Sequence, residues 1–134
     1  MIALDTSVVI AAFASWHEAH VEAAAVFGEE PMLPAPAALE AYAVLTRMPP
    51  PHRVEAQLVQ QFLERSFSGR QLFLPKHRAR HTIDDLTRLG IVGGAAYDAV
   101  IALTAAHHDC ELATLDHRAR VTYERVGVAV RYLG

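Results

Sequence analysis

The sequence predicts an α/β fold, a three-layer α/β/α sandwich with a central parallel sheet of four to five strands. Three observations lead to this prediction. Short apolar segments of strand length alternate along the chain with helical patterns. The first of these segments runs into an acid and then a helix, as strands of open parallel sheets do. A length of 134 residues suits one domain, so residues 1–134 are expected to form a single unit.

The first half of the chain is predicted to hold two strands and four helices. Pro36 suits a first helical turn because its missing N–H would have no partner there, and Pro49-Pro50-Pro51 stops that helix. Gly28 closes an earlier helix. The predicted strands are Ile2–Leu4 and Met32–Ala35, and the predicted helices are Val8–Phe13, His17–Gly28, Pro36–Arg47 and Val54–Phe67.

The second half repeats the alternation of strands and helices. Gly90 ends a basic-rich helix, Gly93-Gly94 forms a turn, and Gly127 caps the last helix. Alternation of this kind implies right-handed crossovers and a parallel sheet covered on both faces. The predicted strands are Leu72–Pro75, Glu111–Leu115 and Val128–Tyr132, and the predicted helices are Lys76–Leu89, Ala95–His108 and His117–Val126.

Composition narrows the class of protein. A single cysteine, Cys110, excludes an internal disulfide framework and fits a reducing compartment. The apolar start lacks a basic region and is interrupted by Asp5, unlike a signal peptide. No apolar run approaches the roughly 20 residues that span a bilayer. We therefore expect a cytoplasmic protein without a membrane segment.

The distribution of charge along the chain is more informative about possible ligands than the net charge is. A net charge of −3 does not indicate a nucleic-acid-binding protein. Residues 1–64, however, carry eight acidic side chains and only two basic ones, Arg47 and Arg53, whereas residues 65–134 carry seven acidic and ten basic. The second half can therefore present a positive surface. In it, Lys76, Arg78, Arg80 and Arg118 are candidates for contacts to the phosphates of a nucleic acid, and a solvated helix face explains them equally well.

Two aspartates follow predicted strands. Asp5 comes after Ile2-Ala3-Leu4, and Asp116 comes after Leu112-Ala113-Thr114-Leu115. Either residue alone is explained as a cap of the helix that follows. Both, however, are expected at the carboxyl ends of parallel strands, where ligands of open α/β sheets collect.

Two further acids stand in apolar helices. Glu40 is the only acid among the alanines and leucines of its helix, and we expect such a helix to be buried. Asp98 falls in the first turn of an alanine-rich helix, above the stripe of Ile101, Ala102 and Ala105. A narrow solvent strip for Glu40 and a solvated first-turn position for Asp98 remain open as alternatives.

The four acids together, Asp5, Glu40, Asp98 and Asp116, predict a metal site. They would face one rim of the sheet, where four carboxylates repel one another unless a hard cation such as Mg²⁺ or Mn²⁺ binds them. Asp5 and Asp98 are expected to be the direct ligands, since one comes from a strand end and the other from a helix start. The chemistry that follows is hydrolysis of a phosphodiester by metal-activated water, leaving a 5′-phosphate.

The chain resembles the PIN-domain nucleases, in particular the VapC toxins of bacterial toxin–antitoxin pairs. The resemblance rests on Asp5-Thr6-Ser7, the lone Glu40, Tyr97-Asp98-Ala99, Thr114-Leu115-Asp116, and the closing run from Leu115 to Ala119 with Tyr123-Glu124-Arg125 after it. It covers the whole chain in length and in the order of elements.

This resemblance implies a PIN-like fold and a Mg²⁺-dependent endoribonuclease, often acting on tRNA or rRNA. It also implies a cognate antitoxin, a homodimer, and Ser7 and Thr114 as hydroxyls that orient the acidic quartet. One position departs from the family pattern: some members carry a fifth acid two residues after the fourth, where this chain has Arg118. A single Mg²⁺ is therefore expected rather than two.

Two other functions compete with this hypothesis. A phosphatase or receiver-type domain would use Asp5 as the phosphorylated nucleophile, but the only lysine, Lys76, does not follow a strand end. A non-catalytic binding module on the same scaffold would not respond to divalent metal.

Overall fold

A computed structural model describes residues 1–134 and contains parallel strands surrounded by helices. The strands are β1 (Ile2–Leu4), β2 (Leu33–Pro34), β3 (Gln71–Leu72), β4 (Glu111–Thr114) and β5 (Val130–Tyr132). The helices are α1 (Thr6–Phe13), α2 (His20–Ala25), α3 (Ala35–Arg47), α4 (Ala56–Ser66), α5 (Lys76–Ala79), α6 (Thr82–Leu89), α7 (Ala95–His107) and α8 (Arg120–Val126). Two 3₁₀ helices, η1 (Val26–Glu29) and η2 (His117–Ala119), complete the chain.

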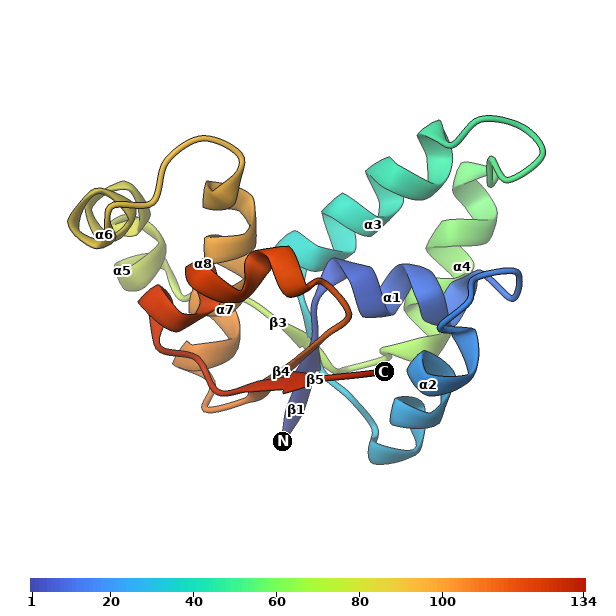
Figure 1. The fold of residues 1–134 in the computed structure, drawn as a ribbon, viewed down its shortest axis with the longest axis horizontal. Helices are drawn as coiled ribbons and strands as arrows, with labels where there is room; N and C mark the ends of the chain where they lie inside the picture. Colours follow the sequence, from blue (N-terminus) through green and yellow to red (C-terminus); the bar gives the residue numbers. More distant parts are fainter.

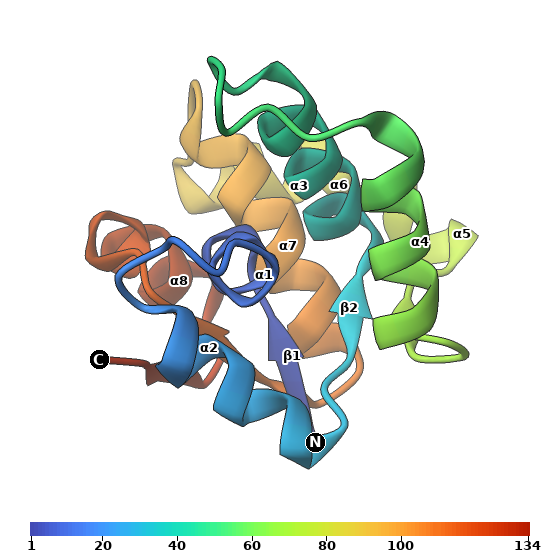
Figure 2. The same ribbon diagram turned by 90° about the vertical axis from the view of Figure 1, so that its right-hand side faces the viewer.

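The five strands are all parallel, as predicted, but they do not form one continuous sheet. β1, β4 and β5 form a three-stranded sheet in the order β1-β4-β5, and β2 pairs only with β3. A single bridge, Ala3 to Met32, joins the two sheets, so β1 and β2 lie side by side (Figure 2). All residues of β1 are buried, and so are the last three of β4. Both faces of these strands are therefore covered, as in the predicted sandwich.

Several predicted boundaries are wrong. The helix predicted over Lys76–Leu89 is two helices, α5 and α6, because the chain bends at Arg80 and His81 and the Thr82 hydroxyl donates to the Ala79 carbonyl. The two helices lie on one side of the molecule, opposite α2 and α4 (Figure 1). The helix predicted from His17 begins at His20, because the His17 ring accepts the Ala19 amide in a turn. The strand predicted over Leu72–Pro75 is reduced to Gln71–Leu72.

The expectation that α3 is buried all round is also wrong. Only one stripe of α3 is buried, formed by Ala37, Ala41 and Leu45 at helical spacing. Leu39 is 71% exposed on another face. By contrast, Ile101, Ala102 and Ala105 of α7 are buried, as predicted. None of the helices combines the length and the apolar character that crossing a bilayer requires.

Candidate active site

The carboxyl ends of β1 and β4 meet at one edge of the sheet. The strands pair in register, Leu4 opposite Ala113, and the Asp5 amide donates to the Ala113 carbonyl at 3.1 Å. Asp5 and Asp116 leave these two strand ends, as predicted. Ser7 connects the ends, because its Oγ donates to Asp5 Oδ1 at 2.5 Å and accepts the Leu115 amide at 2.9 Å. This edge of the sheet is the candidate site.

Asp5 is only 3% exposed. Its Oδ1 also accepts the Val8 amide at 3.3 Å, so Asp5 caps α1 while it contributes to the site. Its Oδ2 accepts the hydroxyl of Tyr123 at 2.7 Å. Burial raises the pKa of Asp5, while the hydroxyls of Ser7, Thr114 and Tyr123 and the Val8 amide act in the opposite direction. A buried carboxylate with this many donors is held in one orientation.

Asp98 stands in the first turn of α7 and is half-buried. Its pKa is raised from 3.8 to about 6, first by burial and then by the charges of Glu40, Asp116 and Asp5 in that order, while Arg118 opposes them. The fold thus brings the four acids, which come from four separate segments, into electrostatic contact.

Glu40 is half-buried on α3, at a groove between α3 and α7. The groove has a volume of about 530 Å³ and is mainly apolar, with the exposed side chains of Leu39 and Tyr97 on its rim. Glu40 therefore has neither of the two environments considered from the sequence, full burial or a purely solvated strip.

Asp116 is held by the turn that follows it. Its Oδ1 accepts the Arg118 amide at 2.9 Å and the Arg118 Nε at 3.4 Å, so Asp116 caps η2. Its own amide donates to Thr114 Oγ1 at 2.9 Å. Capping and site formation are therefore compatible for Asp116, as they are for Asp5. Arg118 therefore places a positive charge beside the Asp116 carboxylate.

The donor set fits a hard divalent cation in its chemistry. Carboxylate oxygens are the ligands that Mg²⁺ and Mn²⁺ prefer, and the acids around Asp98 leave a negative charge that Arg118 only partly offsets. No three histidine, cysteine, aspartate or glutamate side chains are arranged to hold a metal ion among them.

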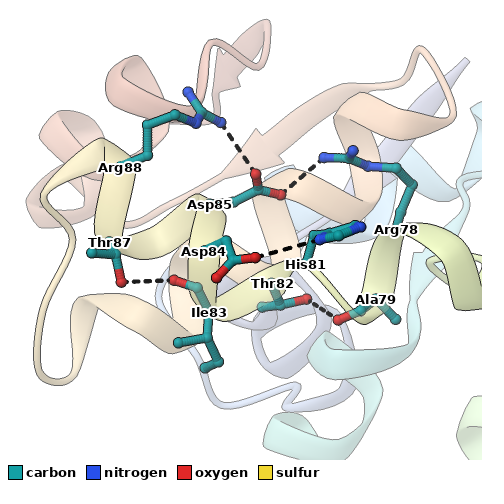
Figure 3. Close-up of polar contacts among 9 residues, drawn as sticks. All are labelled: Arg78, Ala79, His81, Thr82, Ile83, Asp84, Asp85, Thr87 and Arg88. Atoms are coloured by element: carbon teal, nitrogen blue, oxygen red, sulfur yellow. Dashed lines mark hydrogen bonds and ion pairs between the residues drawn. The ribbon is translucent and has the colours of Figure 1, made fainter.

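Of the four predicted RNA-binding cations, only Arg118 lies at the acids. Arg78 lines a small cavity with Leu103, Ala106 and His107, near the end of α7. From Asp98 to Ala106 the helix rises about 12 Å at 1.5 Å per residue. Arg78 is also paired with Asp85 at 2.9 Å, and Asp85 pairs in turn with Arg88 at 3.2 Å (Figure 3). Lys76 and Arg80 are exposed on the same segment.

Tyr123 was not among the site residues predicted from the sequence. The residue is 1% exposed, and its hydroxyl donates to a carboxylate 118 positions away in the chain. The available signal was a large aromatic residue in the short, mostly polar helix α8, which indicates burial but not a polar partner.

Comparisons with known proteins show which family the chain resembles. The PIN domain profile matches residues 2–125. The chain is 44% identical over 130 residues to Ribonuclease VapC40 of Mycobacterium tuberculosis, covering 97% of both chains. It is 40% identical over 130 residues to Ribonuclease VapC27 of the same organism, covering 96% of this chain and 94% of that one.

Solved structures resemble the fold at lower identity. A structure of FitAB bound to an IR36 DNA fragment superposes with a TM-score of 0.73 at 22% identity, covering 98% of this chain and 94% of that one. The crystal structure of FitAcB from Neisseria gonorrhoeae gives 0.69 at 22% identity, covering 97% and 96%. Since identity is low, these two likenesses concern the fold alone.

Proposed function

The chain belongs to the PIN-domain family, and from this premise we propose that it is a VapC-type toxin, a metal-dependent endoribonuclease. The observation that carries the proposal is the meeting of the strand ends that lead to Asp5 and Asp116, next to Asp98, whose pKa is raised to about 6 by burial and by the charges of Glu40, Asp116 and Asp5. Carboxylates brought together at the end of a parallel sheet are a set of ligands suited to a hard divalent cation. The chain is similar over most of its length to two ribonucleases, VapC40 and VapC27, and this similarity supports RNA as the substrate.

In this proposal Asp5 and Asp98 bind a single Mg²⁺, for which Mn²⁺ can substitute. The bound ion lowers the pKa of a water molecule and neutralises charge on the phosphate. Ser7 and Tyr123 hold the Asp5 carboxylate, and Thr114 holds the backbone at Asp116. Glu40 and Asp116 complete the negative charge and orient the attacking water. Attack by water needs no RNA 2′-hydroxyl, so the products carry a 5′-phosphate.

Arg118 is the residue we propose for contact with an RNA phosphate beside the scissile bond. It is 95% exposed and lies at the acids, where it can exchange its ion pair with Asp116 for a phosphate. Lys76 and Arg80 remain candidates for contacts farther along the RNA, with Arg78 less available because Asp85 binds it.

The partners and location follow from the proposed toxin class. We propose a cognate antitoxin that blocks the acidic site, a tRNA or rRNA target, a homodimer and a cytoplasmic location. The buried, unpaired Cys110 supports a reducing compartment. Exposed apolar side chains on the groove between α3 and α7, Leu39 and Tyr97, support a protein partner on that face.

The geometry argues against the phosphatase or receiver-type alternative. Such a domain would need a lysine beside the phosphorylated Asp5. Lys76 lies on α5 rather than at the acids. A non-catalytic binding module remains the alternative that the experiment must separate.

The test is cleavage of total RNA by the purified chain with Mg²⁺ and with EDTA. We expect 5′-phosphate products from the wild type with Mg²⁺, and none with EDTA or from Asp98→Asn. Asp84→Asn is the matched control, because Asp84 is an aspartate on α6 with an 80% exposed side chain. Equal cleavage by wild type and Asp98→Asn would refute the proposed active site, and binding of RNA without metal-dependent cleavage would favour the binding module.

A further inference from the structure

We propose that Tyr123 is a positioning residue that orients the Asp5 carboxylate so that Oδ2 is the oxygen presented to a divalent cation. This inference rests on the proposed function, because it requires a cation at the four acids. Tyr123 itself does not contact the cation or the RNA in this proposal.

The two oxygens of Asp5 are not equivalent. Oδ1 accepts two hydrogen bonds, from Ser7 Oγ at 2.5 Å and from the Val8 amide at 3.3 Å. Oδ2 accepts one, from the Tyr123 hydroxyl at 2.7 Å. Because a carboxylate oxygen offers about two lone-pair positions, Oδ1 is fully engaged by its own turn of the chain. Oδ2 keeps one position for a metal bond.

The two oxygens of Asp5 are held from different elements. Both donors to Oδ1, Ser7 and Val8, belong to α1, whereas the hydroxyl that donates to Oδ2 belongs to α8. Tyr123 therefore fixes the carboxylate from outside the turn that engages Oδ1.

Tyr123 is suited to fix an orientation. The residue is 1% exposed and belongs to the main hydrophobic core, which restricts its rotamer. Its hydroxyl donates to Oδ2 at 2.7 Å and occupies one of the two lone-pair positions of that oxygen. Partners that orient metal ligands in this way typically change metal affinity about 10–100-fold when they are removed.

The experiment is calorimetric titration of Mn²⁺ alone into the full chain, without RNA. Tyr123→Phe removes only the hydroxyl, and Tyr42→Phe, at an exposed tyrosine of α3, is the matched control. We expect Tyr123→Phe to bind Mn²⁺ about 10–100-fold more weakly than the wild type, and Tyr42→Phe to bind it equally. Each protein is titrated at a temperature well below its thermal unfolding midpoint, so that a loss of metal affinity is not confused with a loss of folded protein.

The outcomes distinguish this inference from the proposed function. Equal Mn²⁺ affinity of wild type and Tyr123→Phe would overturn the role of Tyr123 and leave the nuclease proposal intact. A wild type that binds no Mn²⁺ would overturn both. If Tyr123→Phe does not fold, the Tyr123 hydroxyl proton is followed by NMR in the wild type as Mg²⁺ is added. A shift supports the inference, and an unchanged resonance at saturating Mg²⁺ overturns it.

Discussion

Glu40, on α3, lies close enough to Asp98, at the start of α7, that its charge is the largest electrostatic contribution to the raised pKa of Asp98. The two residues are 58 positions apart in the printed sequence. Their proximity shows how α3 and α7 each contribute an acid to the edge of the sheet where Asp5 and Asp116 already lie. The site is therefore a product of the tertiary fold and of no single motif.

Replacing Glu40 by glutamine is expected to lower the pKa of Asp98 from its value of about 6. The reason is that the ionised Asp98 no longer faces its strongest negative neighbour. The carboxyl carbon of Asp98, followed by NMR titration in EDTA, measures the change. Glu64→Gln on α4 removes the same charge elsewhere and should leave the titration of Asp98 where it is; equal shifts from both variants would contradict the assigned proximity.

The stability of the metal-free chain is expected to fall as pH rises from about 4 to about 7. The folded-state pKa of Asp98 lies above its ordinary value of 3.8, so in this range the folded state binds more protons than the unfolded state. The contribution of Asp98 is intact below pH 3.8 and is lost by the time pH exceeds about 6. Asp5, whose pKa is also raised, acts in the same direction.

The substitution Asp98→Asn removes the contribution of this residue to the pH dependence of stability. The variant should be more stable than the wild type at about pH 8, by about 1 kcal/mol once solvent screening of the half-exposed side chain is allowed for. This difference in the free energy of unfolding should shrink as the pH falls toward about 4.5. Urea unfolding in EDTA at both pH values measures the difference, and a difference independent of pH would show that Asp98 does not titrate as described.

Ser7→Ala is expected to destabilise the metal-free chain by about 1–3 kcal/mol. The variant leaves the Leu115 amide without its acceptor and removes one donor from the buried Asp5 carboxylate. Urea unfolding of Ser7→Ala beside Ser15→Ala, at an exposed serine, tests this contribution. Similar small losses from both substitutions would mean that Ser7 does not join the two strand ends in solution.

Arg118→Ala is expected to weaken RNA binding with little effect on the fold. The guanidinium is 95% exposed, and its pair with Asp116 is a surface ion pair worth about 0–1 kcal/mol. In the variant, the backbone amide of residue 118 can still donate its hydrogen bond to the Asp116 carboxylate. In an Asp98→Asn background, the slope of log affinity against log salt should fall by about one.

Arg78→Ala supplies the comparison, because its guanidinium is paired with Asp85 and lies near the far end of α7. We expect the slope of log affinity against log salt to be the same for Arg78→Ala in the Asp98→Asn background as for Asp98→Asn alone. A larger effect from Arg78→Ala than from Arg118→Ala would move the RNA path from the edge of the sheet to α5.

The parts of the fold that follow from local pattern were predictable. An apolar run ending in Asp5, and a second ending before Asp116, predicted two parallel strands with their acids at one edge, and the pairing of β1 with β4 confirms that arrangement of strands. The break between α5 and α6 was not predictable from periodicity, because the residues around Arg80 and His81 are good enough helix formers to continue the pattern.

Contacts between residues far apart in the sequence were the other part of the structure that could not be predicted. Counting apolar residues indicated a buried α3, but the count does not reveal that Leu39 points to solvent. The sequence likewise gave no reason to link Tyr123 to Asp5, since the hydrogen bond between them depends on how α8 packs against the end of β1. The roles of the four acids as metal ligands and catalytic groups remain predictions.

The most direct test of the central claim is to locate the cation. Crystals of the chain grown with Mn²⁺ and measured at the manganese absorption edge give its position without reference to activity. We predict one Mn²⁺ at the carboxyl end of β1, bonded to Asp5 and Asp98 with water in most of the other positions. An ion bound away from both aspartates, or no ion at a Mn²⁺ concentration that supports RNA cleavage, would contradict the account.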